Sequence, residues 1–367
     1  MSAAGAKRPA PILREPDPRS GSRIAAVGGA RGERLVTNEE LAGPINSSDE
    51  WIKSRTGITT RARATADQSM LDLAEAAARQ AIGRAGLAPA QVDAVILGSV
   101  THFVQTPAAA PQLAARLGAV GAAAFDVSAA CAGYCYGIGL ADGLVRAGAA
   151  ANVLVVGADK LSDMVDPTDR TISFLLGDGA GAAVVTASDR PRIGPTVWGS
   201  DGSKADRVGQ NLDFREAVAS GIWPTLRQDG PVVYKWAVFE MAKVALAAIA
   251  AAGLAPDDIE VFIPHQANLR IIEQQVKRIG FGPDVVVARD IAETGNTSAA
   301  SIPLATERLG RDDPAVGGRL ALQIGFGAGL AYAAQVVELP PAAGLQDIPQ
   351  DNQEDTNERN ARGTGQD

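Results

Sequence analysis

The hydrophobic positions of the chain fall into two kinds of segment that alternate along most of its length. Continuous apolar runs at 94–98, 152–157 and 182–186 are typical of strands that are buried on both faces of a sheet. Elsewhere apolar residues recur at helical spacing, which predicts helices over 71–85, 108–117, 131–147, 235–252, 268–279 and 297–309. The alternation predicts a layered α/β fold.

The second half of the chain repeats the first. The segment "AGLAPAQVDAVILG" (85–98) aligns with "AGLAPDDIEVFIPH" (252–265), and each follows an alanine-rich helical stretch. Further on, "LLGDGAGAAVV" (175–185) matches "QIGFGAGLAYA" (323–333) glycine for glycine. We therefore expect a duplicated αβ unit with pseudo-twofold symmetry.

The repeat also sets the expected domain organisation. One half should span 22–190 and the other 191–340. Residues 1–21 are mixed polar with prolines and lack the apolar core of a secretory signal, so a flexible extension is expected. Residues 341–367 lack periodicity, which predicts a disordered tail. No uncharged apolar stretch of about eighteen residues predicts a membrane span.

Composition narrows the class of function. The apolar fraction of 46% and the charged fraction of 21% are ordinary for a globular protein. A net charge of −8 argues against nucleic acid as the main partner. Two cysteines and two histidines do not have the spacing of a metal site, so no metal is expected. The low cysteine content indicates a reducing, cytoplasmic setting.

Candidate chemistry begins with Cys131, in "FDVSAACAGY" (125–134), where an apolar strand gives way to a helix. A thiol at a helix N-terminus lies near unpaired N–H groups that favour the thiolate. The small residues around it leave room for a substrate. The alternative is that Cys131 is one more small apolar residue of the helix, as we expect for Cys135.

Two further candidates occupy matching places in the second half. His265 ends the strand that repeats the one ending at Gly98, which makes it a candidate acid, base or hydrogen-bond donor; a core histidine is the alternative. Asn296 starts the helix that matches the one after Cys131, where an ordinary N-cap is the alternative. The pseudo-twofold would bring Cys131, His265 and Asn296 together. His102 has no such partners and is expected to be structural.

With these residues assembled, the chain resembles β-ketoacyl-acyl carrier protein synthase III, the initiating condensing enzyme of type II fatty acid synthesis in the thiolase superfamily. The similarity covers about residues 22–340. It rests on seven motifs in order: "SSDEWIKSRTGITTR" (47–61), "DVSAACAGY" (126–134), "DPTDR" (166–170), "GDGAGAAVV" (177–185), "PHQANLRII" (264–272), "TGNTSAASIPLA" (294–305) and "GFGAGLAY" (325–332). The resemblance implies a thiolase-like layered αβαβα fold.

The resemblance also implies roles for the candidate residues. Cys131 would accept the acyl group, and His265 and Asn296 would hydrogen-bond the malonyl thioester carbonyl. Backbone amides at Cys131 and Ala328 would form the oxyanion hole, although the family often has glycine where this chain has Ala328.

Binding residues follow from the same resemblance. Trp51 would stack on the adenine of coenzyme A between Arg55 and Arg170, and Asn268 would hydrogen-bond the pantetheine. An acidic acyl carrier protein would dock on the family's docking segment, here Gln266, Ala267, Asn268, Leu269 and Arg270, and on Lys235, which is expected to begin a helix. Lys277 and Arg278 extend this basic face.

The implied reaction joins an acyl-CoA primer to malonyl-acyl carrier protein with loss of carbon dioxide. The "GFGAGLAY" turn lacks the second catalytic cysteine of a thiolase, which favours this decarboxylative reaction. The alternatives are a priming ketosynthase or acyltransferase of a polyketide pathway, a cysteine hydrolase, and a non-catalytic scaffold. Family members are homodimers, and the apolar segment 104–118 is expected to contribute to a subunit interface.

Overall fold

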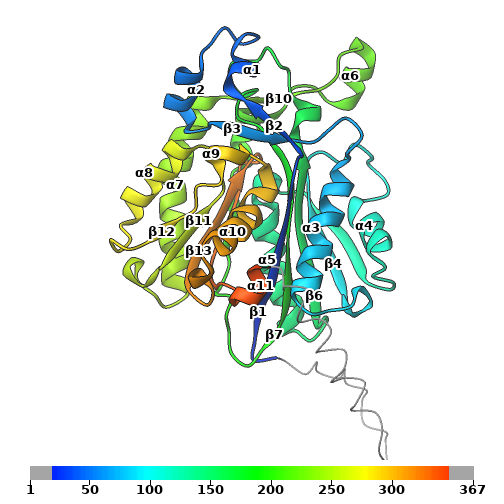
Figure 1. The fold of residues 1–367 in the computed structure, drawn as a ribbon, viewed down its shortest axis with the longest axis vertical. Coiled ribbons are helices and arrows are strands. Elements are labelled where there is room, and N and C mark those ends of the chain that lie inside the picture. Colours follow the sequence, from blue (N-terminus) through cyan, green and yellow to red (C-terminus); the bar gives the residue numbers. More distant parts are fainter. Residues whose placement is uncertain (1–18, 347–367) are drawn as a thin grey trace, which may run out of the picture.

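The computed structural model describes residues 19–346 and has two five-stranded sheets at its centre (Figure 1). The first sheet contains, in spatial order, β1 (Gly21–Arg31), β7 (Asp178–Ser188), β6 (Asn152–Lys160), β4 (Ala94–Gly98) and β5 (Ala123–Val127). The second contains β8 (Val197–Ser200), β14 (Ala331–Glu338), β13 (Leu320–Gly327), β11 (Val261–Pro264) and β12 (Val286–Val287).

The two sheets have the same topology. In the first, β4 is parallel to both β5 and β6, while β7 is antiparallel to β6 and to β1. In the second, β11 is parallel to β12 and β13, while β14 is antiparallel to β13 and to β8. The predicted duplication is therefore confirmed strand by strand.

Helices form three layers around the sheets. Between the sheets lie α5 (Gly133–Arg146) and α10 (Ser301–Asp312), which share one apolar core with strands of both. The outer face of the first sheet is covered by α3 (Met70–Arg84) and α4 (Ala109–Leu117). The outer face of the second is covered by α7 (Gly230–Ala251) and α8 (Leu269–Ile279). The predicted αβαβα layering is confirmed.

The remaining elements gather mainly at one end of the molecule, at the top of Figure 1. They include the hairpin of β2 (Arg34–Thr37) and β3 (Thr60–Arg63), the hairpin of β9 (Val208–Gln210) and β10 (Leu226–Gln228), and the helices α1 (Asn38–Ala42), α2 (Asp49–Thr56), α6 (Phe214–Ser220) and α9 (Ile291–Thr294). These segments surround the carboxyl ends of the parallel strands, where open α/β sheets bind ligands.

Each predicted helix overlaps a helix of the structure, with shifted ends. The largest shift at an N-terminus is in α7, which begins at Gly230 because Asp229 accepts a hydrogen bond from Val232 N–H and Pro231 occupies the first turn. Lys235 therefore lies inside the helix, and the prediction that it begins one is wrong.

The predicted glycine alignment is also wrong. Strand register makes β13 the counterpart of β6, and β14 the counterpart of β7. The motif at 177–181 opens β7, whereas the motif at 325–329 ends β13 and leads into β14. Both places need small residues because helices and loops of the other half approach the strands closely there, so similar composition arises at non-equivalent positions.

The ends of the chain were only partly predicted. Most of the expected extension (1–21) and tail (341–367) lies outside the described residues. Within the described part of the tail, α11 (Ala342–Leu345) is folded, with Leu345 fully buried beside Gly310. The predicted disorder is therefore wrong for the start of the tail, because a four-residue helix is too short to show periodicity. In the part of the chain that the structure describes, no helix is long and apolar enough to cross a membrane.

Candidate active site

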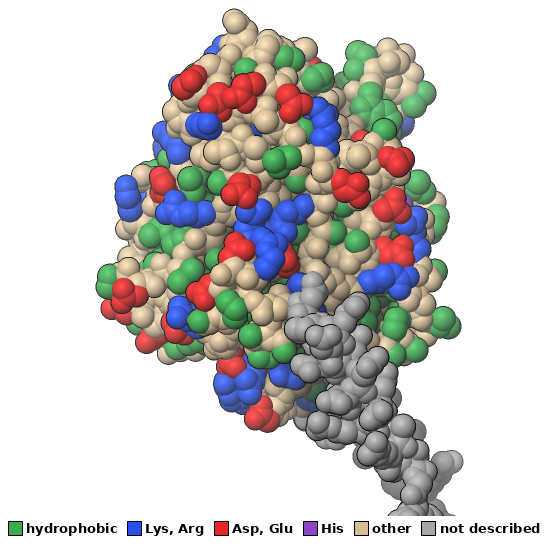
Figure 2. All heavy atoms as spheres, in the orientation of Figure 1, with side chains coloured by type: hydrophobic (Ala, Val, Ile, Leu, Met, Phe, Trp, Pro, Cys, Tyr) green, Lys and Arg blue, Asp and Glu red, His purple; other side chains and the backbone are tan. Residues whose placement is uncertain are grey.

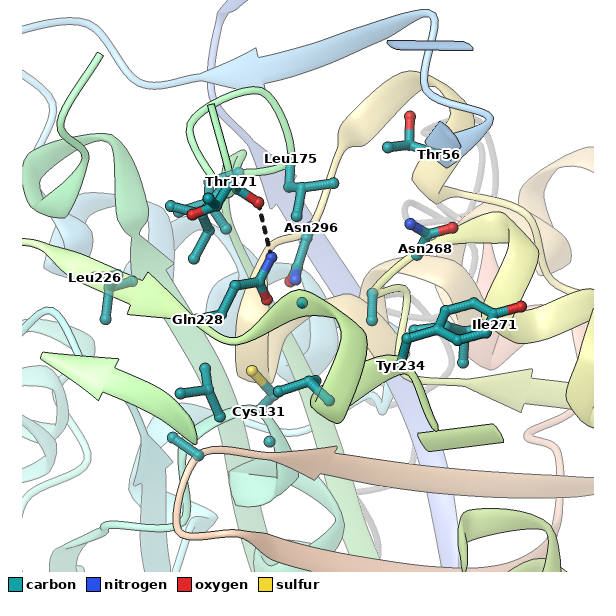
Figure 3. A pocket seen from close by; sticks show the side chains of 18 of the residues that line it. Thr56, Cys131, Thr171, Leu175, Leu226, Gln228, Tyr234, Asn268, Ile271 and Asn296 are labelled. Carbon is teal, nitrogen blue, oxygen red and sulfur yellow. Dashed lines mark hydrogen bonds between the residues drawn. The ribbon is translucent and has the colours of Figure 1, made fainter. Parts of the chain in front are cut away.

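A pocket of about 500 Å³ lies between the two halves (Figure 3). Cys131, His265 and Asn296 all line it. Figure 3 shows Cys131 and Asn296 among the side chains that line the cavity, together with Gln228 and Tyr234. Three residues that are far apart in sequence thus share one cavity.

Cys131 lies on a 3-10 turn, Ala130–Ala132, between β5 and the first residue of α5. Ala130 has a left-handed backbone with φ of 46°, which makes the sharp turn. Part of Cys131 is open to the pocket, but surrounding protein atoms bury the thiol and raise its pKa to about 11. The loss of solvation raises the pKa of the Cys131 thiol more than the nearby helix N-terminus lowers it. Cys131 is therefore a protonated thiol before substrate binds.

Gly327 forms the wall next to the nucleophile. A Cβ atom at this position would lie 2.9 Å from Cys131 Cβ and 3.0 Å from Cys131 Sγ. Only glycine leaves room for the thiol here, and Ala328 lines the pocket directly after it.

His265 follows the last residue of β11 and is 2% exposed. Its Nδ1 lies 2.7 Å from Ser301 Oγ, and its ring packs against Phe326 with centroids 5.3 Å apart. Burial lowers the pKa of His265 to about 3, so the imidazole is neutral near pH 7. Ser301 Oγ also accepts from Gln266 N–H at 3.3 Å, so we infer that its own proton goes to Nδ1 and that Nε2 carries the ring proton.

The pseudo-twofold relates this histidine to a place without a side chain. His265 corresponds to Gly98, and Ser301 corresponds to Gly133. A Cβ on Gly98 would lie 3.1 Å from the backbone of Gly133, so the first half has close backbone packing where the second has a hydrogen-bonded pair.

Asn296 is held by the segment that precedes β7. Its backbone N–H donates to Leu175 O, its carbonyl accepts from Gly177 N–H, and its side-chain Oδ1 accepts from Ser298 N–H at 2.9 Å. Because Oδ1 is occupied, the amide presents Nδ2 as its donor.

The prediction that Asn296 starts the helix equivalent to that of Cys131 is wrong in register. The left-handed residue that corresponds to Ala130 is Ser298, with φ of 54°, so the counterpart of Cys131 is Ala299. Asn296 lies three residues earlier, before the turn. The loop that precedes the turn therefore positions Asn296 in the same pocket as Cys131.

The predicted coenzyme A residues also line the pocket. Trp51 projects from α2, with its ring edge-to-face with Phe174 at a centroid distance of 5.3 Å. The guanidinium of Arg170 lies 4.8 Å from the Trp51 ring centroid, and that of Arg55 lies 5.5 Å away. Asn268 caps α8 by accepting from Arg270 N–H, and its Nδ2 donates to the carbonyl of Arg55.

The predicted docking residues differ in their exposure and contacts. Ala267, Asn268 and Arg270 line the pocket, and Lys235 is exposed on α7. Leu269, partly buried, packs close to Gly57.

Gln266 is the exception that the structure corrects. It is fully buried: its Nε2 donates to Pro264 O at 2.7 Å and its Oε1 accepts from Ile291 N–H. The side chain therefore braces the turn after β11, and its predicted contact with a carrier protein is wrong.

Several lining residues were not predicted. Gln228 Nε2 donates to Thr171 O at 3.0 Å across the cavity, as the dashed line in Figure 3 shows, and Tyr234 lies on the opposite side. Gln228 lies on a short strand within the irregular stretch 201–229, where no periodicity marks an element. Ser298 and Ser301 lie within the motif "TGNTSAAS", but their serines gave no separate signal.

Comparison with known proteins places these features in a family. The family model 3-oxoacyl-[acyl-carrier-protein] synthase III matches residues 125–202, and its C-terminal counterpart matches 249–339. A β-ketoacyl-[acyl-carrier-protein] synthase III of Kocuria rhizophila is 52% identical over 347 residues, covering 88% of this chain and 98% of that protein. The protein of the same name from Streptomyces glaucescens is 53% identical over 321 residues, covering 87% and 96%.

Solved structures agree. The priming β-ketosynthase of the R1128 polyketide biosynthetic pathway superposes with a TM-score of 0.88 at 45% identity, covering 90% of this chain and 100% of that one. The 3-oxoacyl-(acyl carrier protein) synthase III of Pseudomonas aeruginosa gives 0.81 at 36% identity, also over 90% and 100%. Fold, motif order and overall identity therefore agree, and the chain belongs to the β-ketoacyl-[acyl-carrier-protein] synthase III family of condensing acyltransferases.

Proposed function

We propose that this chain joins an acyl-CoA primer to malonyl-acyl carrier protein, with release of carbon dioxide, and so initiates type II fatty acid synthesis. The observation that carries the proposal is the convergence of Cys131, His265 and Asn296 on one pocket. The names of the relatives that are 52% and 53% identical to this chain support the same reaction.

The first step is acyl transfer to Cys131. The thiol attacks the thioester carbonyl of the primer, the carbonyl oxygen becomes negative, and coenzyme A leaves. Backbone N–H groups of Cys131 and Ala328, which both line the pocket, would stabilise this oxygen. This chemistry needs a nucleophile and hydrogen-bond donors, and it uses no metal or other cofactor.

The second step is decarboxylation of the malonyl group. His265 Nε2–H and Asn296 Nδ2 donate to the malonyl thioester carbonyl, whose oxygen takes up negative charge as carbon dioxide leaves. A neutral donor suits this step because it stabilises the enolate without protonating the carbon. The enolate carbon then attacks the acyl group on Cys131 and releases the thiol.

The entrance supports binding of coenzyme A. Trp51 offers a ring for the adenine, and Arg55 and Arg170 offer charge for phosphate groups. A gap of 4.8 Å between Arg170 and the Trp51 centroid is too short to admit another ring, because stacked planes need about 3.5 Å on each side. Arg170 must therefore move when adenine stacks. Asn268, which lines the same pocket, would hydrogen-bond the pantetheine.

Carrier-protein docking belongs to the same proposal. Arg270 lies over Tyr234 and Arg278 lies 3.8 Å from the Phe239 ring centroid, so α7 and α8 together present cations on aromatic surface. Lys235 and Lys277 add charge beside them. Acidic and basic side chains are interspersed on the face in Figure 2, so an acidic partner would have to find these cations locally.

A homodimer is the proposed assembly. β5 is an edge strand whose only sheet neighbour is β4 within the described residues, yet Phe125 is 38% exposed, and Val120, in the turn before β5, is 87% exposed. A second copy could pair with this edge. The segment 104–118 stays a predicted part of the interface: α4 buries Leu113 and Leu117 in the core of the first half, while Val104 is 51% exposed.

A cytoplasmic location is proposed as well. Cys131 and Cys135 are both free thiols, and acyl transfer requires Cys131 to remain reduced.

The polyketide alternative keeps specific support. The R1128 priming β-ketosynthase has a TM-score of 0.88 to this chain. A cysteine hydrolase is disfavoured because the partner of His265 Nδ1 is the Ser301 hydroxyl, with no carboxylate bonded to the imidazole.

Intact-protein mass after mixing with acetyl-, isobutyryl- and hexanoyl-CoA tests the proposal. One adduct, absent in Cys131→Ser, followed by carbon dioxide release from malonyl-acyl carrier protein, would support it. An adduct without carbon dioxide release would point to an acyltransferase, and no adduct would refute the priming step.

A further inference from the structure

A buried carboxylate that the proposed reaction leaves unused lies close to the nucleophile. Asp159, near the end of β6, is fully buried. Its Oδ1 accepts from Val100 N–H at 2.7 Å, Ser99 Oγ at 3.0 Å and Thr101 Oγ1 at 3.1 Å. Its Oδ2 is buried without a hydrogen-bond partner. Such an oxygen is costly in a protein interior and needs an explanation.

The pseudo-twofold indicates where Asp159 points. Strand register makes Asp159 the counterpart of Gly327, the residue that faces Cys131. Asp159 should therefore face the Ser298–Ala300 turn. Gly157, two residues earlier in β6, points to the same face of the sheet as Asp159. A Cβ on Gly157 would lie 2.2 Å from Ala299 O, which supports this direction for Asp159.

Ser298 connects the carboxylate to the nucleophile. Its side chain lines the pocket with Cys131, and it lies close enough to Cys131 and to Asp159 to lower the pKa of each. Ser298 Oγ is buried, and it meets strict hydrogen-bond geometry with neither. Ser298 therefore lies near both groups without a formed hydrogen bond to either, as catalytic residues often do before substrate binds.

We propose that Asp159, acting through Ser298, takes up the proton that Cys131 loses when it attacks the thioester. The inference rests on the proposed role of Cys131. As the bond from Sγ to the carbonyl carbon forms, the thiol proton passes to Ser298 Oγ, and the hydroxyl proton of Ser298 passes to Asp159 Oδ2. The bond from that carbon to the coenzyme A sulfur breaks, and coenzyme A leaves as a thiolate that is protonated by water.

The proton returns at the end of the cycle. When the condensation breaks the bond between Sγ and the acyl carbon, the departing thiolate recovers a proton from Ser298, and Ser298 recovers its own from Asp159. Each turnover therefore restores both the thiol and the carboxylate.

The surroundings favour this acceptor over others. The described residues that line the pocket include no carboxylate, and His265 is too deeply desolvated to hold a proton near pH 7. Burial raises the pKa of Asp159, which makes it a stronger base than an exposed carboxylate. A negative charge on Asp159 in turn raises the pKa of Cys131, so the pair favours one negative charge at a time.

The other charged groups near this strand end are directed elsewhere. Lys160, the next residue, donates to Thr65 O and lies 3.6 Å from Asp163. Asp178, its partner across the sheet, is bonded to Ser162 and Ala64.

The test follows Cys131 directly, by alkylation with iodoacetamide and by acylation with acetyl-CoA, using intact-protein mass over about pH 5 to 9. The variants are Asp159→Asn, which keeps the shape of the carboxyl, and Ser298→Ala, which removes the hydroxyl. Alanine fits the left-handed backbone because Ala130 occupies the equivalent place. Asp178→Asn is the matched control, a buried carboxylate that does not line the pocket.

Both variants should lose at least about 100-fold in each rate near pH 7, a loss typical of general-base catalysis, and should lose the acid limb of the wild-type profile. Rates within about twofold of wild type, or a fall of equal size at every pH, would overturn the proposal. If Asp159→Asn does not fold, Ser298→Ala carries the test. A wild-type protein that is alkylated but never acylated would refute the proposed function, while the alkylation profile would still decide the proton path.

Discussion

At the scale of single residues, the active site depends on atoms that are missing as much as on those that are present. Gly327 is the clearest case, because its absent side chain is the space that the Cys131 thiol occupies. The neighbouring Ala328 shows that the wall tolerates a methyl group one residue further on.

Replacing Gly327 with alanine should therefore disable Cys131. The new methyl would lie about 3.0 Å from Sγ, closer than van der Waals contact allows, and would push the thiol off its line of attack. We expect the rate of acylation by acetyl-CoA, measured by intact mass, to fall at least about 100-fold. Gly143→Ala, in α5 with open space around it, is the control and should acylate normally.

Ser301 should separate the two half-reactions. Without its hydroxyl the neutral His265 can carry its proton on either nitrogen, so fewer molecules present Nε2–H to the malonyl carbonyl. We expect Ser301→Ala to reduce carbon dioxide release by about 10- to 100-fold while Cys131 still takes up the acyl group. Equal losses in both assays would contradict the assigned tautomer.

The burial of His265 also predicts how stability depends on pH. The unfolded chain binds a proton near pH 6.5, whereas the folded chain binds it only near pH 3. The free energy of unfolding should therefore be highest above about pH 6.5 and should fall as the pH is lowered toward 3. Urea titrations at several pH values would show this slope, and His265→Gln should flatten it; an unchanged slope would contradict the argument.

At the scale of elements, the hydrophobic pattern predicted the long helices and buried strands because each is set by local periodicity. The turns were predicted less well. Asn296 was placed on the wrong residue of its turn because the equivalence of the two turns is set by their left-handed residues, Ala130 and Ser298, and composition does not mark that backbone conformation. Gln228 was missed because its short strand is ordered by contacts with distant segments such as Thr171.

The helix α11 offers a test at this scale. Leu345 is fully buried against Gly310, next to the core that the two halves share. Leu345→Ala should lower the free energy of unfolding by about 2–5 kcal/mol, as for other buried leucines, in urea denaturation. Ala343→Ser on the exposed side of the same helix is the control. A loss below about 1 kcal/mol in Leu345→Ala would show that α11 is not part of the cooperative core.

At the scale of the whole molecule, the fold class was predictable because the two halves of the chain contain similar sequence segments. The resemblance predicted a homodimer, but the β5 edge was not predicted as its interface, because an edge strand is recognised only once the sheet order is known. β5 has apolar residues but no second neighbour among the described strands, which is the basis for the proposed dimer.

A charge on this edge should disrupt the assembly. Phe125→Lys would place an ammonium group on the sheet face at the proposed interface, where a second copy would desolvate it and so oppose pairing. We expect light scattering to show a dimer for the wild type and a monomer for Phe125→Lys. Val218→Lys, a charge at an exposed valine of α6, is the control and should remain dimeric. A monomeric wild type would refute the dimer itself.

The pairing of Gly98 and Gly133 with His265 and Ser301 has a consequence for how such a site can arise. A symmetric ancestor of two identical units would have had the same strand-to-helix turn in each unit, and each change of residue would have altered both turns. Once the units were joined in one chain, each strand-to-helix turn could change alone. One turn now carries Cys131, and the other carries Ala299 at the equivalent position. The fused chain thus has one asymmetric reaction centre where two identical halves could only have had symmetric ones.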